Sequence, residues 1–223
     1  MSIFIETLKG KKTKTPIWLM RQAGRHLPEY IKIRQKYKDL MEMFLDPEVI
    51  TEISLQPVKR YGLDACIVFS DILMIPYASG CDVSFKQGVG PQVKFSEKFN
   101  FESHKLDPVT KGIENIKRVS DTPLIGFVGG PWTTLLYCLF NKEERLQMNK
   151  DLINKNEKRI DNHINELTDI ISNYAIQQVN GGIDAFQIFE SAAESLEDEY
   201  LDRWCLEPTQ KIIHSIKSKT DIP

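Results

Sequence analysis

The stretch Pro123-Leu-Ile-Gly-Phe-Val128 decides the fold, because it is apolar at almost every position and no longer than a single strand. Three other stretches share this character: Pro16-Ile-Trp-Leu-Met20, Leu63-Asp-Ala-Cys-Ile-Val-Phe69 and Asp184-Ala-Phe-Gln-Ile-Phe189. Short apolar runs without alternation are typical of strands that are buried on both faces, as in a parallel sheet. The sequence therefore predicts four parallel strands.

Amphipathic helices are predicted between these strands. Asp46 before Pro47 predicts a helix with the aspartate as N-cap and the proline at its first position, and Asp107 before Pro108 repeats the pattern. The longest predicted helix covers 157–179, and a glycine pair ends it. Its apolar positions follow three-four spacing, which predicts one buried stripe. The stripe consists of Ile160, Ile164, Leu167, Ile171, Tyr174 and Ala175.

The alternation of strands and helices indicates a parallel α/β fold. A (β/α)8 barrel of the TIM type is the favoured architecture, and a doubly wound sheet is the alternative. No glycine-rich phosphate loop follows a predicted strand, which weakens a nucleotide-binding version of the doubly wound sheet. Residues 77–104 interrupt the alternation and predict an inserted hairpin.

A closed barrel of this type needs eight strands, whereas the sequence shows about the first four β/α units plus the hairpin. The stretch 213–223 repeats the helix exit and strand entry that precede Pro123. We therefore expect residues 1–223 to form a single incomplete barrel domain that ends just before a fifth strand. Such a domain is expected to have unpaired strand edges and to be marginal alone.

Composition indicates a globular protein, with 41% hydrophobic and 27% charged residues. No apolar run approaches the roughly 20 residues of a membrane span, and no secretory signal is present. The four cysteines lack metal-ligand spacing, so we expect reduced core residues of a cytoplasmic protein. We expect neither nucleic acid nor a membrane as partner. Residues 1–38 carry ten basic but two acidic residues, on an otherwise acidic chain.

The arginines of this basic segment are candidates for binding an anion. Arg21 and Arg25 follow a predicted strand directly and flank Ala23-Gly24, whose small side chains let a ligand approach the backbone. Guanidinium groups beside exposed amides suit carboxylate recognition. For the lysines, and as the alternative for the arginines, a solvated surface position is the simpler interpretation.

Further candidates follow the other strands, because function collects at the carboxyl ends of parallel strands. Asp71 stands among apolar residues, where an isolated carboxylate is costly unless it is functional or caps the next turn. Gly129 and Gly130 permit a close backbone approach, and Tyr137 follows two helical turns later, where a core position is favoured by spacing alone. Ser191 is a candidate ligand donor, with capping of the following helix as the favoured alternative.

These strand ends resemble the uroporphyrinogen decarboxylase family. The stretch from Pro16 to Tyr30, Pro-Ile-Trp-Leu-Met-Arg-Gln-Ala-Gly-Arg-His-Leu-Pro-Glu-Tyr, is similar to the family's first signature. The stretch from Gly126 to Tyr137, Gly-Phe-Val-Gly-Gly-Pro-Trp-Thr-Thr-Leu-Leu-Tyr, resembles its second signature. Phe-Ser-Asp71 and Phe-Glu-Ser191 match two further strand-end motifs, so the resemblance covers essentially the whole chain.

The resemblance implies a homodimeric (β/α)8 barrel that decarboxylates the four acetates of uroporphyrinogen III to give coproporphyrinogen III, without a cofactor. It implies Asp71 and Arg21 as catalytic residues, with Asp71 on the pyrrole N–H groups. The implied substrate contacts are Arg21, Gln22, Ala23, Gly24, Arg25, Asp71, Tyr137 and Ser191. Arg34 matches a further arginine near the family's site. After Tyr137 the chain reads Cys-Leu-Phe-Asn-Lys142, where the family usually has a glutamate followed by glycines.

The chemistry is consistent with this resemblance. A substrate with eight carboxylates calls for arginines, and four pyrrole N–H groups can converge on one carboxylate. A ring protonated on carbon becomes an electron sink, so neither a metal nor an organic cofactor is required. Two alternatives are a non-catalytic remnant that binds porphyrinogen and a zinc- and cobalamin-dependent methyltransferase of the wider superfamily. The second lacks a His-x-Cys motif here.

Overall fold

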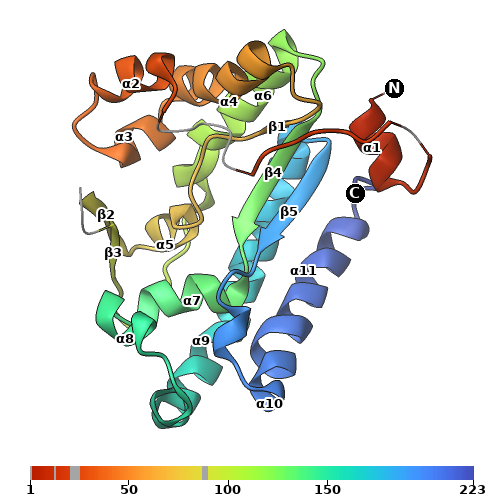
Figure 1. Cartoon of the computed structure of the whole chain (residues 1–223). Helices are drawn as coiled ribbons and strands as arrows, with labels where there is room; N and C mark the ends of the chain where they lie inside the picture. Colours follow the sequence, from red (N-terminus) through yellow and green to blue (C-terminus); the bar gives the residue numbers. More distant parts are fainter. Residues whose placement is uncertain (1, 13, 21–25, 87–89) are drawn as a thin grey trace.

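The structure, a computed structural model, describes residues 2–12, 14–20, 26–86 and 90–223 (Figure 1). The N-terminal elements are α1 (Ile3–Leu8), α2 (Pro28–Arg34), α3 (Leu40–Phe44), α4 (Pro47–Tyr61), β1 (Cys66–Ile67), α5 (Met74–Ala78), β2 (Asp82–Lys86) and β3 (Gly90–Lys94). After a 3-10 turn (Ser103–Leu106) come α6 (Asp107–Val119), β4 (Leu124–Gly129), α7 (Pro131–Leu139), α8 (Lys142–Leu146) and α9 (Lys150–Gly181). The last are β5 (Ala185–Phe189), a 3-10 turn (Ala193–Ser195), α10 (Asp198–Leu201), a π-helical turn (Asp202–Leu206) and α11 (Glu207–Lys217).

Among the described residues, β1, β4 and β5 form a parallel sheet in the order β1-β4-β5. Leu124 and Ile125 of β4 pair with Cys66 and Ile67 of β1, and Ile125 also pairs with Ala185 of β5. The arrows of β4 and β5 point the same way in Figure 1. The predicted parallel α/β fold is thereby confirmed. The predicted hairpin is also present, because β2 and β3 pair antiparallel.

The predicted strand over residues 16–20 is wrong. Ile17 donates its N–H to Asp64 Oδ2 at 2.7 Å and accepts the N–H of Asp64 at 3.0 Å, so the segment runs beside the entry to β1 without forming a ladder. Three of its apolar side chains are more than half exposed: Ile17, Leu19 and Met20. The reason is that the side chain of Asp64, and not a backbone carbonyl, accepts the Ile17 N–H. The four-unit partial barrel therefore stays a prediction.

The helices α4, α6, α9 and α11 form a layer in which each packs against the next. Helix α9 lies against β4, and all residues of its predicted apolar stripe are buried. Its end at the glycine pair is confirmed, because Gly182 caps it in the left-handed conformation at φ 102°. The four cysteines are buried and free, as predicted. No helix in the described ranges is long and apolar enough to cross a membrane.

The two predicted helix starts have different outcomes. Asp46 caps α4 by accepting the N–H groups of Glu48 and Val49, so that prediction is confirmed. Asp107 is wrong as an N-cap, because the helix begins at Asp107 itself and its preceding residue makes no side-chain cap. The Asp107 carboxylate instead accepts a hydrogen bond from Gln177 Nε2 on α9 at 3.1 Å, so a contact between helices replaces the local cap.

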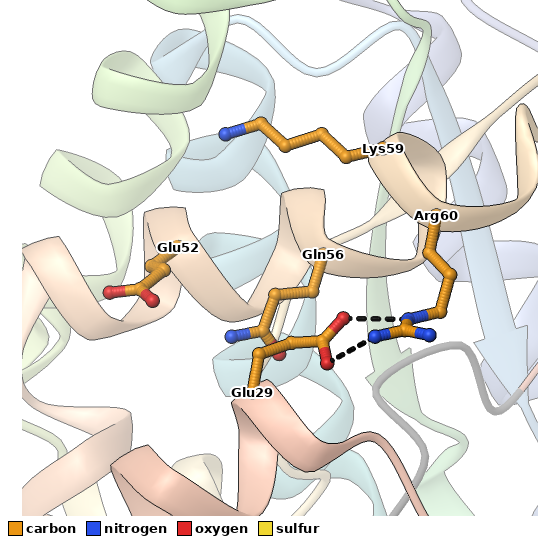
Figure 2. Close-up of a pocket in the computed structure, with 5 residues that line it drawn as sticks. All are labelled: Glu29, Glu52, Gln56, Lys59 and Arg60. Atoms are coloured by element: carbon orange, nitrogen blue, oxygen red, sulfur yellow. Dashed lines mark hydrogen bonds and ion pairs between the residues drawn. The ribbon is translucent and has the colours of Figure 1, made fainter.

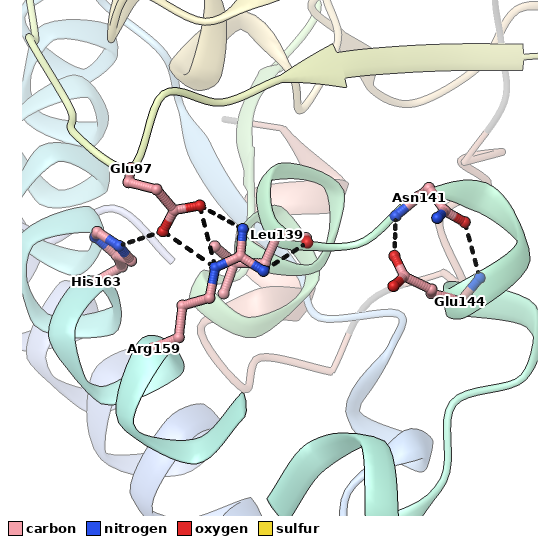
Figure 3. Close-up of polar contacts among 6 residues, drawn as sticks. All are labelled: Glu97, Leu139, Asn141, Glu144, Arg159 and His163. Atoms are coloured by element: carbon pink, nitrogen blue, oxygen red, sulfur yellow. Dashed lines mark hydrogen bonds and ion pairs between the residues drawn. The ribbon is translucent and has the colours of Figure 1, made fainter. Parts of the chain in front are cut away.

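A polar network joins the hairpin to the helices α7 and α9 (Figure 3). Glu97, just after β3, has a positive φ of 59° and accepts hydrogen bonds from Arg159 Nε at 3.0 and 3.1 Å. His163 Nε2 lies 3.3 Å from the same carboxylate. Arg159 also donates to the Leu139 carbonyl at 3.1 Å, at the end of α7. The network fixes the carboxyl end of α7, two residues beyond Tyr137.

Candidate active site

The candidate site lies at the carboxyl edge of the parallel sheet. Because β1, β4 and β5 run parallel and in register, the segments that follow them emerge at the same edge. Asp71 follows β1, Gly130 follows β4 and Ser191 follows β5. Gly130 N–H donates to the Phe189 carbonyl at 2.9 Å, which ties the last two strand ends together. The parallel pairing thus brings three predicted site segments to one edge.

The sequence left two interpretations of Asp71 open, a cap and a functional carboxylate, and the structure confirms the cap. Its Oδ1 accepts the N–H of Leu73 at 2.9 Å, so it does cap the next turn. Leu73 and Met74 beside it are almost completely buried. Burial raises the pKa of Asp71 from 3.8 to about 6, and the Leu73 hydrogen bond opposes only part of that rise. Among the described residues, the Leu73 N–H is the single donor to this carboxylate. With respect to the described residues, this acid has acceptor capacity left.

The predicted arginine loop, Arg21, Gln22, Ala23, Gly24 and Arg25, lies outside the described residues. The segment after it is anchored near the end of β1, because the rings of Tyr30 on α2 and Phe69 pack edge to face at 6.2 Å. Arg34 Nη1 donates to the Tyr37 carbonyl at 2.6 Å, so this arginine closes the turn after α2.

Glu190 is a partly buried carboxylate that the sequence did not single out. It accepts the N–H groups of Trp132 at 3.1 Å and Thr133 at 2.6 Å, at the start of α7. Burial raises its pKa, and these hydrogen bonds oppose the rise. A carboxylate is stabilised at a helix N-terminus by the unpaired N–H groups and the helix dipole. The sequence contains the feature that could have identified it, because an acid directly follows one predicted strand and the Gly130-Pro131 helix start directly follows another.

The glycines before α7 lie against other side chains of this chain, Gly130 against Glu190 and Gly129 against Thr134 and Ile72. A Cβ added to Gly130 would stand 2.1 Å from Glu190 Oε2, and one added to Gly129 would stand 2.9 Å from Ile72 Cβ. Both distances are shorter than nonbonded atoms tolerate. The predicted close backbone approach is therefore present, and its partners are side chains of this chain.

Ser191 is exposed on a turn that is hydrogen-bonded to α7 through the next residue. The next residue, Ala192, donates its N–H to Thr133 Oγ1 at 3.0 Å and accepts from Trp132 Nε1 at 3.2 Å. The favoured capping interpretation of Ser191 is wrong, because the following 3-10 turn has no side-chain cap. Within residues 90–223, no hydrogen bond to the Ser191 hydroxyl is found. The turn is thus held in place while its hydroxyl stays exposed.

Tyr137 lies on α7 and is partly buried. The guanidinium carbon of Arg145 stands 4.3 Å from its ring centroid, within the range of a cation–π contact. Tyr137 is therefore neither a fully buried core residue nor a free surface residue. No group of three His, Cys, Asp or Glu residues in the described ranges has an arrangement that could hold a metal ion.

A separate cleft of about 370 Å³ lies between α2 and α4 (Figure 2). Five residues line it: Glu29, Glu52, Gln56, Lys59 and Arg60. Arg60 donates twice to the Glu29 carboxylate, at 2.8 and 2.7 Å. The cleft includes neither Asp71, Tyr137 nor Ser191, so the predicted site and this cleft are different places.

The Asp71 carboxyl predicts a specific dependence of stability on pH. Its folded-state pKa of about 6 exceeds the ordinary 3.8, so ionisation between about pH 4 and pH 6 destabilises the folded state. Asp71→Asn removes this ionisation. As the pH rises from 4.5 to 7.5, the free energy of unfolding of the variant, measured with urea, should increase by about 1–3 kcal/mol relative to that of the unsubstituted protein. A stability difference that stays constant over this range would contradict the burial argument.

The contact between Gly130 and Glu190 predicts a non-additive pair. Gly130→Ala should lower the free energy of unfolding by about 2 kcal/mol or more, because the new methyl group overlaps the carboxylate. In a Glu190→Ala background the same change should have a much smaller effect, because the overlapping group is gone. Thermal unfolding of the four proteins in this cycle measures the coupling. Additive effects would show that the two residues do not share the space.

Comparisons with known proteins show the family of the chain. A family model for uroporphyrinogen decarboxylase (URO-D) matches residues 1–223. The uroporphyrinogen decarboxylase of Rickettsia rickettsii (strain Sheila Smith) is 39% identical over 227 residues, covering 97% of this chain and 66% of the relative. That of Rickettsia felis is 40% identical over 233 residues, covering 100% and 67%.

The chain thus spans about two thirds of the length of the curated relatives that it matches. Among solved structures, a methyltransferase from Methanosarcina mazei superposes with a TM-score of 0.71 at 19% identity, covering 96% of this chain and 66% of that chain. Identity this low supports a shared fold alone. The match to the family model over the whole chain, with relatives near 40% identity, shows that the chain belongs to the uroporphyrinogen decarboxylase family.

Proposed function

We propose that the protein decarboxylates the four acetate side chains of uroporphyrinogen III to methyl groups, giving coproporphyrinogen III, and that its site is built around Asp71. Family membership over residues 1–223 supports the reaction class. The observation that carries the proposal is the Asp71 carboxyl, which is desolvated, placed at the carboxyl edge of the sheet and bonded to one described donor. A carboxyl that is destabilised in its ionised form is ready to accept donors and a positive charge from a ligand.

The reaction needs a place for the electrons of the breaking bond. Protonation of a pyrrole ring on carbon makes its nitrogen cationic. The bond between the acetate methylene and its carboxylate then breaks, CO2 leaves, and the electron pair moves into the ring. A second proton adds to the exocyclic methylene to give the methyl group, and the ring carbon loses the first proton. The substrate ring itself is the electron sink.

Asp71 matches the needs of this intermediate. One of its oxygens accepts the Leu73 N–H, and its remaining lone pairs are available to pyrrole N–H groups. Donors and a cation both stabilise the ionised carboxyl, so a bound substrate lowers the raised pKa of Asp71. The anion in turn stabilises the developing positive charge on the ring in a desolvated setting. Burial therefore destabilises the ionised Asp71 carboxylate in the empty site and strengthens its attraction to the cationic ring in the transition state.

The other predicted contacts complete the proposal. Arg21 and Arg25, with the Gln22, Ala23 and Gly24 backbone between them, hold substrate carboxylates, and Arg21 orients the departing one. Tyr137 and Ser191 contact the macrocycle from α7 and from the turn after β5. The proposal includes a cofactor-free site, a barrel of which this chain forms the first units, a homodimer and a cytoplasmic location.

Turnover of uroporphyrinogen by Asp71 variants tests the proposal. Asp71→Ala should lower kcat by about 100-fold or more, because a preorganised charge opposite the cationic ring is lost. Asp121→Ala, at an exposed turn, is the matched control and should retain normal turnover. The readout is coproporphyrinogen released per enzyme. Unchanged turnover in Asp71→Ala would contradict the role of Asp71, and a protein that binds uroporphyrin without releasing coproporphyrinogen would be a non-catalytic binder.

A further inference from the structure

Arg145 lies on α8, shortly after the stretch 138–142 in which this chain departs from the usual family sequence. Helix α8 follows α7 directly, and a capping box starts it: Asn141 Oδ1 accepts the Glu144 N–H at 3.0 Å, and Glu144 Oε2 accepts the Asn141 N–H at 2.8 Å (Figure 3). A capping box defines where a helix begins and therefore which way its residues face. The turn is thus ordered by its own side chains, and it carries Arg145 back onto α7.

The Arg145 guanidinium is held at two points. Its carbon stands 4.3 Å from the Tyr137 ring centroid, and its Nη1 donates to the Phe140 carbonyl at 2.6 Å. A guanidinium has five N–H donors in a planar fork, so most of them remain after one bond to a carbonyl. The planar fork suits a carboxylate, and the aromatic ring beneath it fixes the plane. Arg145 is therefore preorganised to bind an anion.

The charge of Arg145 has no anionic partner in the part of the chain that the structure describes. Other arginines do have one, because Arg60 pairs with Glu29 and Arg159 pairs with Glu97. Arg145 is partly buried, and desolvation lowers its pKa. A partly desolvated cation without a counter-ion is unfavourable, and an anion that binds it recovers part of that free energy.

We propose that Arg145 binds a carboxylate of the tetrapyrrole substrate and is a specificity-determining residue of the site beside Tyr137. The inference rests on the proposed function, because that function supplies a substrate with eight carboxylates next to Tyr137. Arg145 stands on the Tyr137 ring and follows the turn in which the family usually has glycines. Arg145 adds a charged recognition element beside Tyr137.

Three variants test the inference with uroporphyrin as a non-reacting probe and uroporphyrinogen as substrate. Arg145→Gln keeps a donor for the Phe140 carbonyl and loses the charge. Arg145→Lys keeps the charge. Arg118→Gln, on an exposed position of α6, is the matched control. Fluorescence titration gives the affinity for uroporphyrin, and initial rates give KM and kcat separately.

Arg145→Gln should weaken uroporphyrin binding and raise KM by about tenfold, as expected for one charge-assisted hydrogen bond. Its kcat should stay within about threefold, because Arg145 does not contact the reacting ring nitrogen. Arg145→Lys should recover most of the affinity, and Arg118→Gln should bind normally. Added salt should weaken binding less in Arg145→Gln than in the unsubstituted protein.

Two results would overturn the inference while leaving the proposed function intact: normal KM and affinity in Arg145→Gln, or equal losses in the Gln and Lys variants. Equal losses would mean that Arg145 only packs on Tyr137, and thermal unfolding would then show matching destabilisation. If the unsubstituted protein neither bound uroporphyrin nor turned over uroporphyrinogen, the proposed function itself would fail and the inference with it.

Discussion

The parallel pairing of β1, β4 and β5 is the constraint on which the rest of the structure depends. The register sets Cys66 beside Leu124 and Ile125 beside Ala185, so the three strands deliver their following segments to one edge. Helix α4 packs on β1 and α9 on β4, with α6 and α11 packed against these helices, and the buried stripe of α9 lies within the main core. Because backbone hydrogen bonds hold this edge, its fold does not depend on favourable interactions of the side chains that lie on it. That freedom allows an unfavourable carboxyl at Asp71.

Two partly buried acids lie at this edge, and they differ in the number of N–H groups that their carboxylates accept. Glu190 accepts two N–H groups at the start of α7, and Gly130 leaves it room. Its charge is therefore compensated by the fold. Asp71 accepts one N–H group in the described structure, and burial raises its pKa to about 6. Glu190, with two backbone donors, fixes the edge, and Asp71, with one described donor, is the acid that we propose for a ligand.

The sequence predicted the features that depend on local pattern. The apolar stripe of α9, its glycine end and the Asp46 cap follow from spacing and residue type within one segment, and all are confirmed. The position of Asp71 at a strand end followed in the same way. The resemblance to the uroporphyrinogen decarboxylases, read from the strand-end motifs, is confirmed by the family match.

Features that depend on partners distant in the chain were predicted wrongly or missed. Residues 16–20 are apolar enough for a strand, but the Asp64 carboxylate, distant in the chain, accepts the Ile17 N–H in place of a backbone carbonyl. Asp107 has the residue type of a cap, but Gln177, on another helix, engages its carboxylate. The contact between Arg145 and Tyr137 joins two helices across a turn, and no periodicity within either helix reveals it.

Asp71 lies at the sheet edge and has a single described donor. We therefore propose that the nitrogens of the porphyrinogen converge on its carboxylate. The structure of the protein with a bound porphyrin tests this most directly. The account predicts Asp71 oxygens at about 2.7–3.2 Å from the ring nitrogens, the range of a hydrogen bond. A macrocycle bound elsewhere, for example in the cleft between α2 and α4, with Asp71 bonded only to Leu73, would contradict it.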